Sequence, residues 1–329
     1  MKKTVIGAAM ILAAAALFAR GVDDTSGRPR VGIAKFVSHE ALDACERGIT
    51  DALAQRGINA VIDYQNANAD ANTAAQIANR FRTERVDVAV GIATPIAVAL
   101  ANAITDRPVV FAAVTDPVGA RLVSSLDRGE RNVTGLSDAI PTVEHIALFK
   151  QVANIRTLGY IYTGSEANSV SALALVEEGC RRSGITLVTQ AITSSAELRQ
   201  AAEAIVGRVD GVYLTTDNTV YSAFPALLQV FNAAKKPVFS GDVTAALGGG
   251  ALIASGFNYY KAGVATGNLV ADIIEGKNPV EIPVRFLTDP SESDLLIDLD
   301  QARNCGITVP QNLQNQANYI FQNGRLTTR

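Results

Sequence analysis

The residues of this sequence that could do chemistry lie in short polar segments, each of which follows an apolar, strand-like run. These segments supply hydroxyl, amide and carboxylate groups. They lack the arrangement of a nucleophile with its base, and no GxSxG, P-loop, GxGxxG or HExxH motif occurs. His39 and Asp43 have the spacing of a pair on one helix face, but such a pair is more often a surface contact than an acid–base pair. We therefore expect no catalytic residue, and binding is favoured over enzymatic activity.

Cysteine and histidine are too sparse for a metal or redox site. Cys45, Cys180 and Cys305 lie far apart, in helix-like stretches, and form no CxxC pair. This pattern indicates small buried thiols rather than a disulfide framework. His39 and His145 are the only histidines, which argues against a zinc site of usual composition. We expect no metal and no cofactor.

In the first half of the chain, four polar residues follow predicted strands. In open α/β sheets, ligands bind at the carboxyl ends of the strands, so these residues are candidate ligand contacts. They are Ser38, Thr94, Thr115 and Asp116. Thr94 precedes Pro95, so it could cap a helix, hold a ligand anion at the helix N-terminus, or do both. Asp116 precedes Pro117 and could start a turn instead.

The second half of the chain offers six candidates at equivalent positions. They are Ser165, Asn168, Ser169, Asp217, Asn218 and Asp242. The alternative for the first three is a solvated loop, and for Asp217 or Asn218 it is a helix cap.

Asp217 is the best single candidate for a charged contact, because its carboxylate could meet a ligand ammonium while Thr94 meets the ligand carboxylate. In that interpretation Asp217→Asn weakens binding about ten- to hundredfold. Because asparagine can keep the cap, the same substitution should leave the melting temperature nearly unchanged.

The elements that must position these residues alternate between strand-like and helix-like runs. Such alternation predicts parallel sheets with right-handed crossovers. Two such series, which separate near residues 132–142, predict an α/β fold of two doubly wound parallel-sheet lobes joined by a multi-crossing hinge. We expect a helix over 221–234 and a strand over 280–282. The predicted lobes comprise residues 30–140 with 256–284, and residues 141–255 with 285–329.

The N-terminus has the pattern of an export signal. Lys2 and Lys3 precede an uncharged, mostly apolar run that ends at Ala19. This run is short for a membrane-spanning helix, which needs about 20 residues. We predict a cleaved signal peptide over 1–19, a linker over 20–29 and a periplasmic protein; the alternative is an uncleaved membrane anchor. The net charge is −3, with no basic stripe, so nucleic-acid binding is not expected.

Several segments, taken together and in order, resemble the ABC transporter substrate-binding proteins of the tryptophan/tyrosine-type group. The resemblance covers about residues 30–310. It rests on residues 39–43 (HEALD), 91–95 (GIATP), 111–120 (FAAVTDPVGA), 132–138 (NVTGLSD), 166–169 (EANS), 216–220 (TDNTV), 258–263 (NYYKAG) and 276–279 (GKNP) with 282–284 (IPV). Glu40 is a departure, because the family is expected to have proline there.

The resemblance implies a type I periplasmic-binding fold and an amino-acid-like ligand, often aromatic. The absence of Trp separately disfavours a sugar ligand, since sugar sites commonly use flat aromatic platforms. We expect a monomer that captures a small molecule and delivers it to the permease and ATPase of an ABC importer. The alternative is an exported ligand-sensing domain or receptor component without a transport role.

Overall fold

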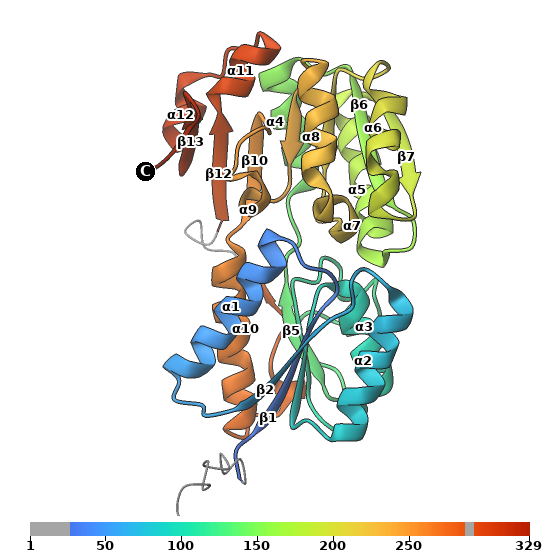
Figure 1. Ribbon diagram of the computed structural model, residues 1–329, viewed down its shortest axis with the longest axis vertical. Helices are drawn as coiled ribbons and strands as arrows, with labels where there is room; N and C mark the ends of the chain where they lie inside the picture. Colours follow the sequence, from blue (N-terminus) through green and yellow to red (C-terminus); the bar gives the residue numbers. More distant parts are fainter. Residues whose placement is uncertain (1–26, 287–292) are drawn as a thin grey trace, which may run out of the picture.

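The structure is a computed structural model that describes residues 27–286 and 293–329, so the predicted signal peptide lies outside the described residues. The chain forms two lobes stacked along the long axis of the molecule (Figure 1). Each lobe has one mostly parallel sheet with helices on both faces, as the alternation of strands and helices predicted. In the described part of the chain, no helix has the length and apolar character needed to cross a membrane.

The first lobe is built on a six-stranded parallel sheet with strand order β11-β5-β4-β3-β1-β2. Helices α1 and α10 cover one face of this sheet, and α2 and α3 cover the other (Figure 1). The elements of this lobe are β1 (Arg30–Lys35), α1 (Glu40–Gln55), β2 (Val61–Asn66), α2 (Ala71–Glu84), β3 (Val88–Ile92), α3 (Thr94–Ala103), β4 (Val109–Ala112), β5 (Val133–Ser137), α10 (Tyr259–Ile274), the 3₁₀ turn η2 (Pro279–Glu281) and β11 (Arg285–Phe286).

The second lobe is built on an eight-stranded sheet with strand order β14-β13-β12-β10-β9-β8-β6-β7. Its strands are β6 (Thr157–Thr163), β7 (Thr186–Ile192), β8 (Gly211–Leu214), β9 (Val238–Ser240), β10 (Ile253–Phe257), β12 (Ser293–Asp298), β13 (Tyr319–Gln322) and β14 (Arg325–Thr328). Its helices are α4 (Thr142–Ala153), α5 (Ala167–Ser183), η1 (Ser195–Glu197), α6 (Leu198–Val206), α7 (Asn218–Ser222), α8 (Phe224–Ala233), α9 (Val243–Ala246), α11 (Leu299–Cys305) and α12 (Gln311–Gln316).

Both faces of the second sheet are covered, which explains why its central strands are apolar throughout. Successive side chains of a strand point to opposite faces. Val212 and Leu214 of β8 accordingly belong to one hydrophobic cluster, and Tyr213 between them belongs to the other. The first lobe has its own core around β1, β3 and β4. Separate cores allow the lobes to move as units.

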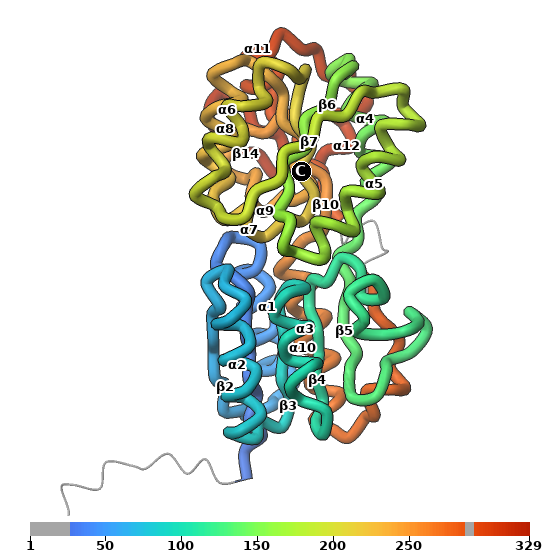
Figure 2. The backbone as a smooth tube through the Cα atoms, turned by 90° about the vertical axis from the view of Figure 1, so that its right-hand side faces the viewer, coloured from blue at the N-terminus to red at the C-terminus, as the bar shows by residue number. Residues whose placement is uncertain are grey.

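The chain passes between the lobes three times: between β5 and α4, between β10 and α10, and between β11 and β12. Figure 2 shows the first two of these connections where the lobes meet. Two details differ from the predicted boundaries. Arg285 and Phe286 pair with β5, so they belong to the first sheet, whereas Phe257 pairs with Ser293 in the second.

Two predicted elements were wrong in detail. Residues 280 and 281 form part of the turn η2 rather than a strand, and Ile282 follows it, because Pro279 begins a 3₁₀ turn that Asn278 caps. The predicted helix over 221–234 is interrupted at Ala223, which ends α7 and precedes α8. Pro225 lies in the first turn of α8, where a missing backbone N–H is tolerated.

Helices α1 and α10 pack unusually closely because glycines face the partner helix. A Cβ atom at Gly263 would lie 2.1 Å from the backbone oxygen of Cys45, and one at Gly48 would lie 2.2 Å from that of Tyr260. Arg56 adds ion pairs to Asp272 and Glu275 at the far end of the same contact. This contact joins the first helix of the chain to the helix that returns from the second lobe.

Candidate functional site

The loops at the carboxyl ends of the strands of both sheets face one another between the lobes. They enclose a small cavity of about 10 Å³, which we call the interlobe cavity. The first lobe contributes His39, Leu42, Ala113, Thr115, Asp138 and Tyr259, and the second contributes Asn168, Thr216, Asp217, Asn218, Tyr221 and Asp242. This is the position at which open α/β sheets bind ligands.

The lobes touch directly at this cavity. The hydroxyl oxygens of Thr115 and Thr216 are 2.8 Å apart, and Thr115 donates its proton to Oδ1 of Asp138 at 3.0 Å. Thr216 must therefore be the donor to Thr115, so a chain of hydrogen bonds leads from the second lobe to the Asp138 carboxylate. The rings of His39 and Tyr221 also meet across the boundary, with centroids 6.2 Å apart. The structure thus describes lobes closed on one another.

Asp138 is a buried carboxylate directly after β5. It accepts hydrogen bonds from Thr115 and, at 2.7 Å, from the hydroxyl of Tyr259 at the start of α10. Burial raises the pKa of Asp138, and these two donors partly offset that shift. Asp138 is not among the ligand contacts predicted from the sequence, although it follows an apolar strand as they do.

Asp242 is the equivalent carboxylate after β9. It caps α9 by accepting the backbone N–H of Ala245 at 3.2 Å. Its pKa is raised to about 7, mainly by burial and in smaller part by the negative charges of Asp138 and Glu40. Asp138 and Asp242 come from different lobes, so closure of the lobes brings two carboxyl groups within electrostatic reach of one another.

Asp217 lines the cavity, but neighbouring donors saturate its carboxylate. Its Oδ1 accepts from the Thr163 hydroxyl at 2.8 Å and from the Val220 backbone N–H at 2.9 Å. Its Oδ2 accepts from the Thr163 backbone N–H at 2.6 Å and the Ser169 hydroxyl at 2.7 Å. Four donors occupy the roughly four acceptor positions of a carboxylate. Burial nevertheless raises its pKa.

Glu166 is a second buried carboxylate beside Asp217, and it is not among the ligand contacts predicted from the sequence. It accepts from the backbone N–H and side chain of Thr219, at 2.9 and 2.7 Å, and from the side chains of Asn218 and Asn168. Burial, followed by the charge of Asp217, raises the pKa of Glu166 to about 7. Glu166 and Asp217 together fix the start of α7 and hold it against β6.

Buried polar atoms of two residues that line the cavity have no hydrogen-bond partner: both ring nitrogens of His39 and Oδ1 of Asn168. The Thr94 hydroxyl, at the start of α3 and outside the lining, also lacks one. Burial lowers the pKa of His39 to about 4, so its ring is neutral at physiological pH. Thr94 does not cap α3 as the sequence suggested. It is the first residue of the helix, and Ala93, with a φ of 85°, occupies the cap position.

The structure brings five of the ten predicted contact residues to the interlobe cavity and places the other five elsewhere. Thr115, Asn168, Asp217, Asn218 and Asp242 line it. Ser38 and Ser165 are exposed, and Ser38 donates to Asp43. Ser169 donates to Asp217, and Thr94 lies buried at the start of α3. Asp116 accepts from the Gly119 backbone N–H at 2.8 Å. Ligand contact by any of the ten remains a prediction.

A second cavity of about 220 Å³ adjoins the first and shares Thr115 and Thr216 with it. We call it the side compartment. Its other lining residues are Asp116, Ala139, Ile140, Thr142, Ser171, Ala172, Ala174, Leu175 and Thr215. Although six of its eleven lining residues are Ser, Thr or Asp, most of the surface that faces the compartment is apolar, in contrast to that of the interlobe cavity.

The remaining chemistry of the described residues is limited. In residues 27–286 and 293–329, no group of three or more His, Cys, Asp and Glu side chains could hold a metal ion. Cys45, Cys180 and Cys305 are free thiols on α1, α5 and α11, and burial raises the pKa of each.

Comparison with known proteins gives a consistent match over the folded chain. A family model described as "ABC transporter substrate binding protein" matches residues 30–320. A tyrosine-binding protein of Clostridioides difficile is 34% identical over 282 residues, which are 84% of this chain and 81% of that protein.

Two solved structures are similar in both sequence and fold. A conserved domain protein of Vibrio cholerae has a TM-score of 0.85 and 39% identity, covering 89% of this chain and 99% of that one. An ABC domain from Streptococcus pneumoniae in complex with L-Trp has a TM-score of 0.84 and 31% identity, covering 89% and 100%. The fold is thus the one the sequence resemblance implied.

Proposed function

This chain belongs to the family of ABC transporter substrate-binding proteins, and from that membership we propose that it captures an amino acid between its lobes for delivery to a membrane permease. A small-molecule binding role is common to the family. The observation that carries the proposal is the interlobe cavity, where polar side chains from the strand ends of both lobes are enclosed together. Its polar groups bond mostly to one another and form no nucleophile–base pair, so we propose binding without catalysis.

We further propose that the ligand is an aromatic amino acid whose side chain occupies the side compartment. The interlobe cavity, of about 10 Å³, has no room for a side chain, whereas the adjoining compartment has about 220 Å³ and a mostly apolar surface. Two relatives bind ligands of this class: tyrosine for the Clostridioides difficile protein and L-Trp for the Streptococcus pneumoniae domain. In this arrangement the Thr115–Thr216 contact lies between the polar and apolar parts of the ligand.

A thermal-shift screen of the mature protein against the twenty common amino acids tests the function. A ligand that binds only the folded state stabilises it by about 2.7 kcal/mol at one hundred times its Kd. We expect tyrosine, tryptophan or phenylalanine to raise the melting temperature most. Stabilisation by a sugar or an inorganic ion, with no response to any amino acid, would contradict the proposal.

Filling the side compartment tests where the ligand side chain lies. Ala139 and Ala174 line the compartment at exposed positions, so Ala139→Phe and Ala174→Phe can fill its mouth without disturbing the core. We expect affinity for the aromatic ligand to fall at least tenfold, while affinity for alanine stays the same. Ala75→Phe, at an exposed position of α2, is the matched control. Equal affinity in all three variants would place the side chain elsewhere.

Members of this family act outside the cytoplasm, and we propose that this protein is periplasmic after loss of residues 1–19. Mass spectrometry of the mature protein should show a chain that begins near residue 20. Recovery of the full-length chain in the inner membrane would support the uncleaved anchor instead. Deletion of the gene should abolish uptake of the labelled ligand; unaffected uptake would favour a sensing role without transport.

A further inference from the structure

We propose that the interlobe cavity recognises the positive charge of its ligand, and that the lobes close around an ammonium group whether or not the ligand carries a carboxylate. This inference rests on the proposed function, because it assumes that the ligand binds in the interlobe cavity. It extends the class of ligands from amino acids to primary amines with the same side chain.

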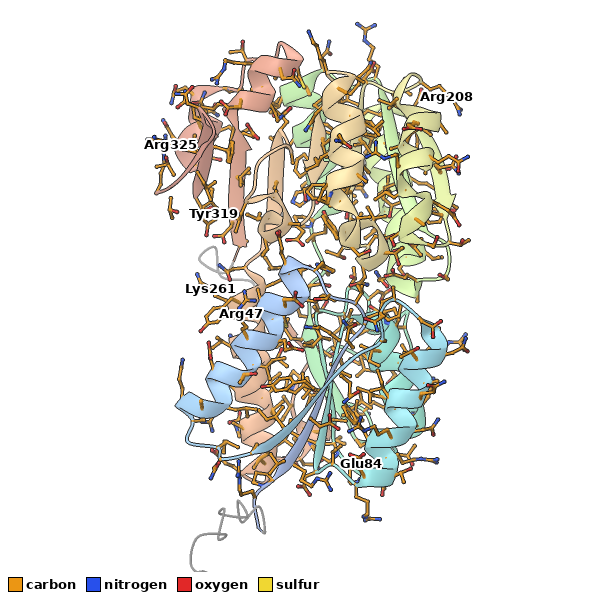
Figure 3. All side chains as sticks on the ribbon, in the orientation of Figure 1. Arg47, Glu84, Arg208, Lys261, Tyr319 and Arg325 are labelled. Atoms are coloured by element: carbon orange, nitrogen blue, oxygen red, sulfur yellow. The ribbon has the colours of Figure 1, made fainter. Side chains whose placement is uncertain are left out.

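The charges that line the cavity are one-sided. Asp138, Asp217 and Asp242 contribute three carboxyl groups, and none of the described residues lining the cavity is Lys or Arg. Figure 3 shows two cations near the lobe boundary, Arg47 and Lys261, on the side of α1 and α10. The charge of Lys35 reaches His39, but Lys35 does not line the cavity and is paired with Asp43 at 2.7 Å and Glu46 at 3.0 Å. Arg47 lines a separate cavity of about 200 Å³, together with residues that include Asp294 and Tyr319. A ligand carboxylate would therefore find neutral donors at most.

Asp138 and Asp242 keep acceptor capacity that Asp217 lacks. Asp138 accepts from two hydroxyl groups and Asp242 from the backbone N–H groups of Ala245 and Thr244, whereas four donors saturate Asp217. A carboxylate has roughly four acceptor positions, so both Asp138 and Asp242 can accept from a ligand. We therefore assign the ammonium contact to these two residues rather than to Asp217.

Asn168 independently indicates a donor group on the ligand. Its side-chain nitrogen donates to Oε2 of Glu166 at 3.2 Å and to the backbone oxygen of Thr216 at 2.9 Å. These two bonds fix the orientation of the amide, so the unpartnered atom is the carbonyl oxygen. Asn168 is 2% exposed and lines the cavity. A buried acceptor without a partner is costly, and a ligand N–H would remove that cost.

Closure of the lobes is favoured by a positive charge on the ligand. Asp138 belongs to the first lobe and Asp242 to the second, so closing brings like charges together in a buried place. An ammonium group has three N–H donors, which match Asp138, Asp242 and the free oxygen of Asn168 in number. A metal ion would serve less well, because no described group of acidic side chains could hold one.

A series of ligands with one side chain separates the two charges. We expect tyramine, which lacks the carboxylate, to bind within tenfold of L-tyrosine in calorimetry. N-acetyl-L-tyrosine and 3-(4-hydroxyphenyl)propionate, which lack the ammonium, should bind at least 100-fold more weakly. Binding of the propionate within tenfold of L-tyrosine, with loss of tyramine, would overturn the inference and leave the proposed function standing. No binding by any of the four compounds would overturn both.

A substitution at Asp242 checks the same assignment from the protein side. Asp242→Asn keeps a helix-capping side chain but removes the charge. We expect at least a tenfold loss of affinity for L-tyrosine and tyramine alike, with no loss for the propionate. Asp106→Asn, at a surface position, is the matched control and should change none of the three. If Asp242→Asn lowered the affinities for tyramine and for the propionate equally, the inference would be overturned, because a purely structural role of Asp242 would produce that pattern.

Discussion

Replacement of Asp217 by asparagine is expected to destabilise the second lobe. Each carboxylate oxygen of Asp217 accepts one hydroxyl and one backbone N–H: Thr163 hydroxyl with Val220 N–H, and Ser169 hydroxyl with Thr163 N–H. An asparagine has one oxygen and one NH₂ group in the same place. Hydroxyl groups can rotate to accept from NH₂, but a backbone N–H cannot. In either orientation of the amide, one buried backbone N–H therefore loses its partner.

The size of the effect follows from that single lost partner. An unsatisfied buried donor costs about 1–3 kcal/mol. The loss of charge on the remaining bonds adds to this cost, while removal of one of two neighbouring buried carboxylates, the other being Glu166, offsets part of it. We expect a net loss of about 2 kcal/mol in the free energy of unfolding. At about 2–4 °C per kcal/mol for a unit of 150–250 residues, the melting temperature should fall by about 4–8 °C.

Differential scanning calorimetry and urea unfolding of the ligand-free protein measure this loss. Thr163→Val is the control, because it removes one hydroxyl donor and keeps both backbone N–H partners; its loss should be about half as large. Calorimetry with L-tyrosine well below the melting temperature should show less than a threefold change in affinity for Asp217→Asn. An unchanged melting temperature with affinity reduced about ten- to hundredfold would refute this reasoning and restore the ammonium contact inferred from sequence.

Three further predictions concern charge, helix packing and lobe closure. The pKa of Asp242 is about 7 in the folded state, well above its unfolded value. The folded protein therefore holds an extra proton between about pH 4 and 7 and loses stability as the pH rises through that range. Asp242→Asn should flatten this part of a plot of melting temperature against pH, and at pH 7.5 it should be more stable than the parent protein. Gly263→Ala should lower the melting temperature of the first lobe, because its Cβ would lie 2.1 Å from the Cys45 backbone oxygen. Gly276→Ala is the comparison: its Cβ would meet nothing within 4 Å, so the substitution should cost only the backbone strain of a residue with a φ of 108°. Thr216→Val removes the donor to Thr115, so small-angle scattering should show a larger radius of gyration for the ligand-free variant than for the parent protein; an unchanged radius would mean that this bond does not hold the lobes together.

Sequence reasoning worked where local signals were sufficient. Strand-like runs ending in polar residues predicted that Thr115, Asn168 and Asp242 would lie at one edge of their sheets, and parallel connections placed them there. It failed for the C-terminal strands β12, β13 and β14, which were not predicted as members of the second sheet. β12 pairs antiparallel with β10, so its place in the sheet does not follow from the alternation of strands and helices that predicts parallel strands. Asp138 and Glu166 were passed over because a single carboxylate carries no sign of its future burial.

The sequence by itself determined the two-lobed α/β architecture and the sheet edges at which polar groups gather, because helix and strand periodicity and the handedness of crossovers are local properties of the chain. Only the tertiary structure decided which of the acids at those edges can meet a ligand. Asp217 and Asp242 look alike in sequence, since each follows an apolar strand and caps a short helix. Thr163 and Ser169, from β6 and α5, saturate Asp217, whereas Asp242 faces Asp138 across the lobe boundary. Partners some fifty or a hundred residues away make that difference, and they are set only when the sheets assemble and the lobes close.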